Sequence, residues 1–113
     1  MPTSKHSISL HDAIDMTKRY RDQKDNIVKP EYANLLPLSE TFDKSAFDIL
    51  SGEPGCASIR AYLGMDNDLV VRLIFVAVDA NGQDILPPAQ GAEIMENGSH
   101  CPPVCGGPSL LNS

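Results

Sequence analysis

Hydrophobic and polar residues follow two different periods along this chain of 113 residues. In the first half, apolar side chains recur at three- and four-residue intervals, which is typical of amphipathic helices. Residues 9–24 and 42–51 are the two segments with this pattern. The first stripe comprises Leu10, Ala13, Ile14 and Thr17, and the second comprises Phe42, Ala46, Phe47 and Leu50. The pattern predicts two helices.

End signals support both helices. Ser9 is a suitable N-cap for the first helix, and Asp12 stands three residues later, at a capping-box position. Thr41 or Asp43 provides the cap of the second helix, and Gly52 provides its stop signal. These signals place the helix ends close to the limits of the two apolar stripes.

The period changes to two at residue 57. Apolar side chains alternate with polar or small ones over residues 57–65, which predicts a strand with one apolar face, formed by Ala57, Ile59, Ala61, Leu63 and Met65. A turn at residues 66–68 leads into residues 69–78, of which nine are apolar, so this second strand requires burial on both faces. After a turn at Asn81 and Gly82, residues 83–86 form a candidate third strand.

These elements predict one α+β domain at residues 1–86, with two helices packed on one face of a small antiparallel sheet of two or three strands. Residues 25–38 show no period, and we expect a loop there with a short extended piece near residues 33–36. Residues 87–113 are rich in proline and glycine and contain a pair of cysteines, which predicts an irregular tail.

The second strand also leads to a prediction about assembly. Two helices cover only one face of so small a sheet, and the other face carries the side chains of Val70, Ile74, Val76 and Val78. Burying each of them is worth roughly 1.5–3 kcal/mol, and leaving them exposed creates a patch typical of an interface. We therefore expect either the C-terminal tail or a second subunit to cover them, and we predict a homo-oligomer or a protein partner.

Charge and hydropathy exclude some partners. The net charge of −6 disfavours nucleic acid, because phosphate binding requires clustered Lys and Arg. No apolar segment of a signal peptide follows Met1, and no stretch approaches the roughly 18 apolar residues of a membrane span. We therefore expect a cytoplasmic protein without a membrane partner.

The chain has three cysteines, and an odd number in a cytoplasmic chain favours free thiols, a metal site or a redox pair over a disulfide scaffold. Cys101 and Cys105 enclose three residues, so a disulfide between them is sterically feasible. The spacing is not the C-x-x-C of thioredoxin-like sites. A thiol/disulfide switch is the first hypothesis for this pair.

A second hypothesis adds Cys56 and His100 to Cys101 and Cys105, because these four side chains provide a Cys₃His donor set for structural zinc. Only one pair has the spacing of a zinc knuckle. A third hypothesis treats the thiols as small buried hydrophobes, which is the favoured interpretation of Cys56. Apart from zinc, no cofactor is indicated.

Nucleotide-binding, hydrolase and zinc-protease motifs are absent. This leaves no catalytic residue to name, although catalytic residues need not be neighbours in sequence. We therefore predict a non-enzymatic interaction or self-assembly subunit that buries an apolar sheet face. The alternatives are the cysteine-based site and a small-molecule pocket between the helices and the sheet.

Several segments occur in an order that resembles one group of proteins. They are the helix from Ile8 to Arg21 and the residues 42–50, 54–56, 59–62, 76–84 and 101–105. Over most of its length the chain resembles small, uncharacterised bacterial proteins that end in a C-P-P-x-C motif. The resemblance implies an α+β fold and a cytoplasmic location, and it implies no activity. Residues 26–40 depart from the pattern of the group.

Overall fold

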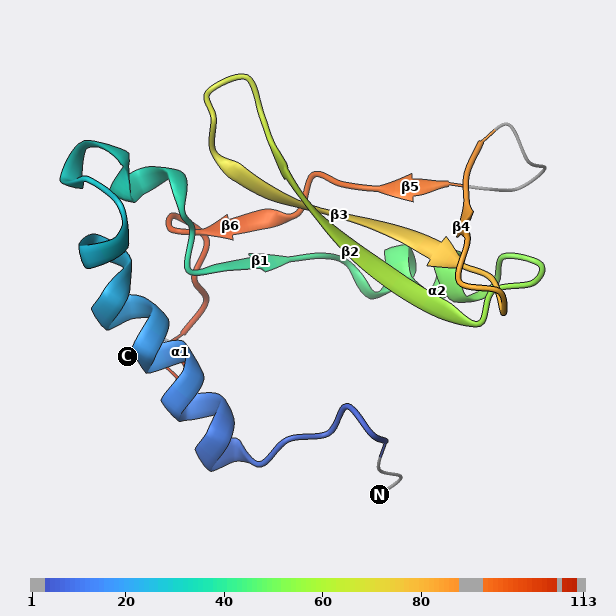
Figure 1. Cartoon of the computed structure of the whole chain (residues 1–113), viewed down its shortest axis with the longest axis horizontal. Coiled ribbons are helices and arrows are strands. Elements are labelled where there is room, and N and C mark those ends of the chain that lie inside the picture. The colour runs from blue at the N-terminus through green and yellow to red at the C-terminus, as the bar shows by residue number, and fades with distance from the viewer. Residues whose placement is uncertain (1–3, 88–92, 108, 112–113) are drawn as a thin grey trace.

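The computed structural model of the protein describes residues 4–87, 93–107 and 109–111. In these residues two α-helices and a 3-10 helix accompany two antiparallel sheets, one of two strands and one of four (Figure 1). The elements are α1 (Leu10–Ile27), η1 (Pro30–Leu35), β1 (Ser39–Thr41), α2 (Lys44–Ser51), β2 (Ser58–Met65), β3 (Val71–Val78), β4 (Asp84–Ile85), β5 (Ile94–Met95) and β6 (Ser99–Cys101). The predicted α+β class is confirmed. The predicted number of strands, two or three in one sheet, was too low.

The hairpin of β2 and β3 is the centre of the four-stranded sheet, and its register runs from Ser58 opposite Val78 to Met65 opposite Val71. The Asp66 carboxylate shapes the turn by accepting the backbone N–H groups of Asp68 and Val70, at 2.9 and 3.0 Å. The first strand therefore forms where the period-two pattern predicted it, and the second forms within the apolar run of residues 69–78. The candidate third strand at residues 83–86 appears as the short β4.

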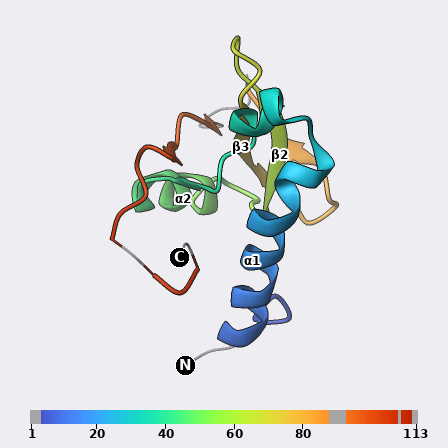
Figure 2. The ribbon, with the colours of Figure 1, turned by 90° about the vertical axis from the view of Figure 1, so that its left-hand side faces the viewer.

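The two helices have different surroundings (Figures 1 and 2). The N-cap prediction for α1 is confirmed, since Oγ of Ser9 accepts the N–H of Asp12 at 3.0 Å. However, α1 buries none of its residues and lies beside η1, while α2 packs on β2 and β3. The prediction that both helices cover the sheet is therefore wrong for α1. Its narrow apolar stripe includes the hydroxyl of Thr17, which donates to the carbonyl of Ala13.

An aromatic cluster fastens α2 to the sheet. The ring of Phe75 on β3 lies 5.0 Å from the rings of both Phe42 and Phe47, in edge-to-face geometry. Leu50 of α2 and Ala77 of β3 are fully buried. In the sequence, Leu50 lies three residues after Phe47, and Ala77 lies two residues after Phe75. The three rings are themselves half-buried, and the fully buried side chains beside them are aliphatic.

The second face of the sheet is covered by the chain itself. Val76 and Val78 are only 2% and 3% exposed, and Val70 and Ile74 are half-buried. Arg60 and Tyr62 on β2 share that face with Asp84 on β4, and both donate hydrogen bonds to its carboxylate. These bonds cross β3, so the long side chains lie over the valines and keep their polar ends in water. The four residues proposed for an interface therefore do not form an open surface.

Two segments contain more structure than predicted. Residues 33–36, expected to be extended, belong mainly to η1, which Pro30 starts at a favoured first position. The predicted irregular tail contributes β5, which pairs with β3, and β6, which pairs with β1. Residues 88–92, 108, 112 and 113 of that tail lie outside the described part. Within the described ranges, no helix has the length and hydropathy needed to cross a membrane.

Candidate functional site

The predicted cysteine pair closes a short loop at the end of β6. Cys101 and Cys105 form a disulfide, with their Cα atoms 4.5 Å apart. Cys101 is 1% exposed, whereas residues 102–107 lie at the surface. The N–H of Val104 also donates to the carbonyl of His100, at 2.8 Å. The two links make a compact loop that continues directly from the two-stranded sheet.

His100 lies beside a carboxylate that the sequence analysis did not single out. Glu40 and His100 are opposite one another in the β1–β6 pair, and Nε2 of His100 is 2.8 Å from Oε2 of Glu40. The two side chains are 2% and 10% exposed. The same Oε2 accepts the backbone N–H of Leu73 on β3, at 3.2 Å. A single buried carboxylate thus joins the two-stranded sheet to the four-stranded sheet.

Arg72 extends this polar network toward the surface. Its guanidinium lies 3.4 Å from Nδ1 of His100, donates to the carbonyl of Gly98 at 3.1 Å and pairs with Glu96 at 3.1 Å. Because a guanidinium has no acceptor, Nδ1 of His100 accepts, and the network assigns the proton to Nε2, facing Glu40. Both ring nitrogens are therefore engaged. The arrangement ties strands together and does not present His100 as a free acid or base.

Cys56 lies far from the cysteine pair. The residue after it, Ala57, donates its N–H to the carbonyl of Val78 at one end of β3, whereas His100 contacts Arg72 at the other end. Six residues of strand separate these points by about 20 Å. The structure therefore does not bring Cys56 to His100, Cys101 and Cys105. In the described part of the chain, no three His, Cys, Asp or Glu side chains form a group suited to a metal ion.

The outer edge of β2 is open. Among the described residues, β2 pairs only with β3, whose opposite edge is occupied by β4, β5 and the Glu40 carboxylate. In an antiparallel ladder, the N–H and C=O groups of two opposed residues point either toward each other or away from each other. Leu73 directs its N–H away from β2, to Glu40. Its partner Leu63 therefore directs its own N–H and C=O away from β3, toward the outer edge. The direction of the backbone groups alternates along a strand, so the N–H and C=O groups of Ile59, Ala61 and Met65 also point outward.

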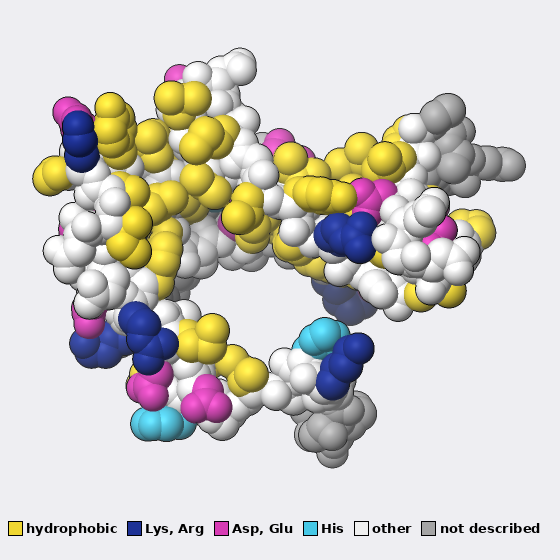
Figure 3. Space-filling view, viewed as in Figure 1, with side chains coloured by type: hydrophobic (Ala, Val, Ile, Leu, Met, Phe, Trp, Pro, Cys, Tyr) yellow, Lys and Arg dark blue, Asp and Glu magenta, His cyan; other side chains and the backbone are white. Residues whose placement is uncertain are grey.

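The outward-facing residues carry exposed apolar side chains. Leu63 is 79% exposed, and Met65 and Ile59 are also exposed. Leu69, in the turn that follows, adds to this group. Figure 3 shows hydrophobic side chains spread over the hairpin on the face that it displays. The strand therefore combines free hydrogen-bonding groups with an apolar surface, and we call Ser58–Met65 with these side chains the β2 edge.

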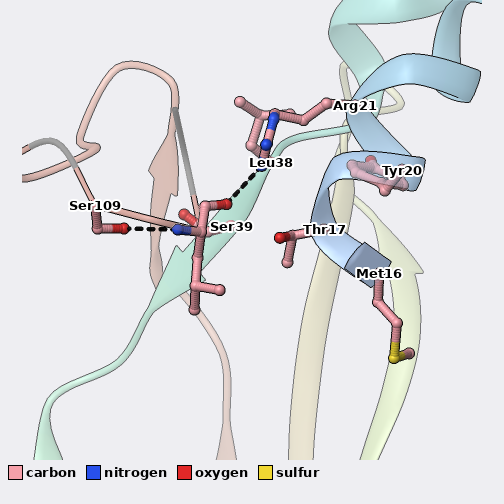
Figure 4. A pocket seen from close by; sticks show the side chains of 8 residues that line it. Met16, Thr17, Tyr20, Arg21, Leu38, Ser39 and Ser109 are labelled. Carbon is pink, nitrogen blue, oxygen red and sulfur yellow. Dashed lines mark hydrogen bonds between the residues drawn. The ribbon is translucent and has the colours of Figure 1, made fainter. Parts of the chain in front are cut away.

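A cavity of about 510 Å³ lies between α1 and the start of β1 (Figure 4). It is lined by Met16, Thr17, Tyr20, Arg21, Leu38, Ser39, Ser109 and Leu111. Two of its polar side chains hold its walls together: Tyr20 donates to the carbonyl of Pro37 at 2.8 Å, and Arg21 donates to that of Leu111 at 2.6 Å. Partial burial raises the pKa of Tyr20. The cavity lies away from the predicted place between the helices and the main sheet.

No protein-family model, curated protein or solved structure matches the chain.

Proposed function

We propose that the protein is an interaction subunit that accepts an additional β-strand along the β2 edge. The observation that carries this proposal is the coincidence of two properties on the same alternate residues. Ile59, Ala61, Leu63 and Met65 direct their N–H and C=O groups outward, and three of them expose large apolar side chains. Strand addition satisfies the backbone groups and buries the side chains in a single step.

The β2 edge lacks the features that proteins use to block edge pairing. Exposed edges are commonly protected by inward-pointing charges, by proline or by a covering loop. In Ser58–Met65 the only charged residue is Arg60, which is bound to Asp84 on the opposite face. The strand contains no proline. An edge of eight residues left in this state is suited to pairing.

The test uses a labelled peptide with the sequence of residues 57–66 as the added strand. We expect its fluorescence anisotropy to rise on titration with the protein. Ala61→Pro removes an outward N–H without removing a bond to β3, so this variant should bind the peptide more weakly. Leu63→Lys should do the same by placing a charge on the edge.

Ile27→Lys is the matched control for Leu63→Lys. Ile27 is 78% exposed but lies at the end of α1, so its replacement should leave peptide binding unchanged. Equal binding by all variants, or no binding by the unaltered protein, would refute strand addition at this edge.

A second candidate function is the thiol/disulfide switch at Cys101 and Cys105. The observation that favours it is the position of Cys101 directly after His100, whose side chain belongs to the network between the sheets. A dithiol reductant would convert the bond to two thiols and become a cyclic disulfide itself. The stability measurement with and without reductant, described below, tests whether the bond affects the fold.

A further inference from the structure

We infer that the strand added to β2 is the β2 strand of a second copy of this chain, paired antiparallel about a two-fold axis through Tyr62. This inference rests on the proposed function and specifies its partner. An isologous contact of this kind requires a surface that is complementary to itself. The β2 edge meets that requirement in its hydrogen bonds, its side-chain sizes and its charge.

The hydrogen bonds restrict the register. In a two-fold antiparallel pair, outward-facing residues of one strand must stand opposite outward-facing residues of the other. An axis through Tyr62 places Ala61 opposite Leu63 and Ile59 opposite Met65, each in both directions. All four outward residues are then paired with one another, giving about eight backbone hydrogen bonds at two per pair.

Other registers use the edge less fully. An axis through Ala61 places Met65 opposite Ala57, which precedes the strand. An axis through Leu63 places Ile59 opposite Asn67, in the turn. The Tyr62 axis is therefore the register that pairs all four outward-facing residues of β2 with one another, over residues 59–65.

The side chains also fit this register. The small Ala61 lies opposite the large Leu63, and the two larger residues Ile59 and Met65 lie opposite one another, so a continuous apolar stripe crosses the interface. On the other face, Arg60 stands opposite Gly64 of the second copy, which has no side chain to obstruct it. Arg60 keeps its partner Asp84 in its own chain, so the one charge that the strand carries is compensated within each copy.

The size and charge of the chain determine how the dimer should behave. One strand pair with its side chains falls at the low end of specific interfaces, so the dimer should depend on concentration. Each copy has a net charge of −6, and the resulting repulsion is screened by salt. A partner strand from a basic protein would show the opposite salt dependence, because salt would weaken its attraction to this acidic chain.

The test combines sedimentation with cysteine cross-linking in the full chain, in a Cys56→Ser background that removes the free thiol. Sedimentation equilibrium should show a monomer–dimer equilibrium that shifts toward dimer as salt is raised. Tyr62→Cys should form a covalent dimer on mild oxidation, because residues at the axis are a non-hydrogen-bonded pair with Cα atoms about 4.5 Å apart, within disulfide range.

A second pair of variants avoids the loss of the Tyr62 hydrogen bond. Ala61→Cys and Leu63→Cys should cross-link when mixed, and neither should cross-link alone. A covalent dimer from either variant alone would overturn the register. A monomer at all concentrations and salts, from a protein that still binds the peptide of residues 57–66, would overturn the homodimer and leave strand addition intact. If the protein is a monomer and also fails to bind the peptide, both the homodimer and strand addition are overturned.

Discussion

The backbone N–H of Leu73 donates to Oε2 of Glu40 over 3.2 Å, so a side chain from one sheet completes the edge of the other. This contact occupies the part of β3 that β4 and β5 do not reach. It also shows which way the backbone groups of the hairpin point. In the described structure, it leaves β2 as the open long edge of the four-stranded sheet.

The first prediction concerns Glu40. Glu40→Ala leaves the N–H of Leu73 and Nε2 of His100 without their buried acceptor, and we expect a loss of about 3 kcal/mol in the free energy of unfolding. Glu40→Gln keeps an acceptor and should cost less. Urea denaturation followed by circular dichroism measures both. Glu31→Ala, at an exposed residue of η1, is the control and should have little effect; equal effects of Glu40→Ala and Glu31→Ala would show that the network contributes nothing.

The second prediction concerns the aromatic cluster. Phe75→Ala removes the ring that contacts both Phe42 and Phe47, and because this ring is half-buried the free energy of unfolding should fall by about 3 kcal/mol, the low end for a ring in a core. Phe75→Leu retains most of the volume and should cost less. Thermal and denaturant unfolding give the two values. The exposed Tyr32→Ala is the comparison, and a similar effect at both positions would contradict the proposed core.

The sequence predicted the parts of the fold that depend on patterns of neighbouring residues. Ser9 caps α1, and the change to period two marks β2. The β1–β6 sheet could not be predicted in this way, since Glu40 and His100 are 60 residues apart and each strand has only three residues. A period needs a longer segment than that to become visible.

The candidate site had one overlooked signal. Arg72 is the single charged residue in a run of apolar residues, and a charge on a buried strand requires partners. That signal could have indicated the network, although it could not identify Glu40. The sequence also did not predict which residues cover Val76 and Val78. Arg60 and Tyr62 occupy alternate positions typical of side chains that face solvent, and only the structure shows that these side chains cross β3.

The third prediction concerns the disulfide. Reduction, or the double variant Cys101→Ala with Cys105→Ala, releases a loop of about five residues, and the chain-entropy model gives a loss of about 2 kcal/mol. Denaturation of the unaltered protein with and without a dithiol reductant measures this. Cys56→Ser keeps the disulfide and should respond to reductant in the same way as the unaltered chain. Identical unfolding curves with and without reductant would count against a switch that acts through the fold.

The last prediction concerns pH and the docking of α1. The hydroxyl of Tyr20 donates to the carbonyl of Pro37 at 2.8 Å, and burial raises the pKa of Tyr20 above its ordinary value of 10.0. The folded chain therefore holds this proton more tightly than the unfolded chain. The resulting stabilisation is fully present below the unfolded pKa and is lost as the pH rises through the folded pKa.

Tyr20→Phe separates this effect from general alkaline unfolding. The phenylalanine variant lacks both the hydrogen bond and the ionisable group, so it should be less stable at neutral pH and should lose less stability between about pH 8 and about pH 11. An absorbance titration of the tyrosinate band, with the variant subtracted, should give a midpoint for Tyr20 above 10.0. If instead the stabilities of the two proteins fell in parallel with pH, the contact between Tyr20 and Pro37 would not be what holds α1 to the segment before β1.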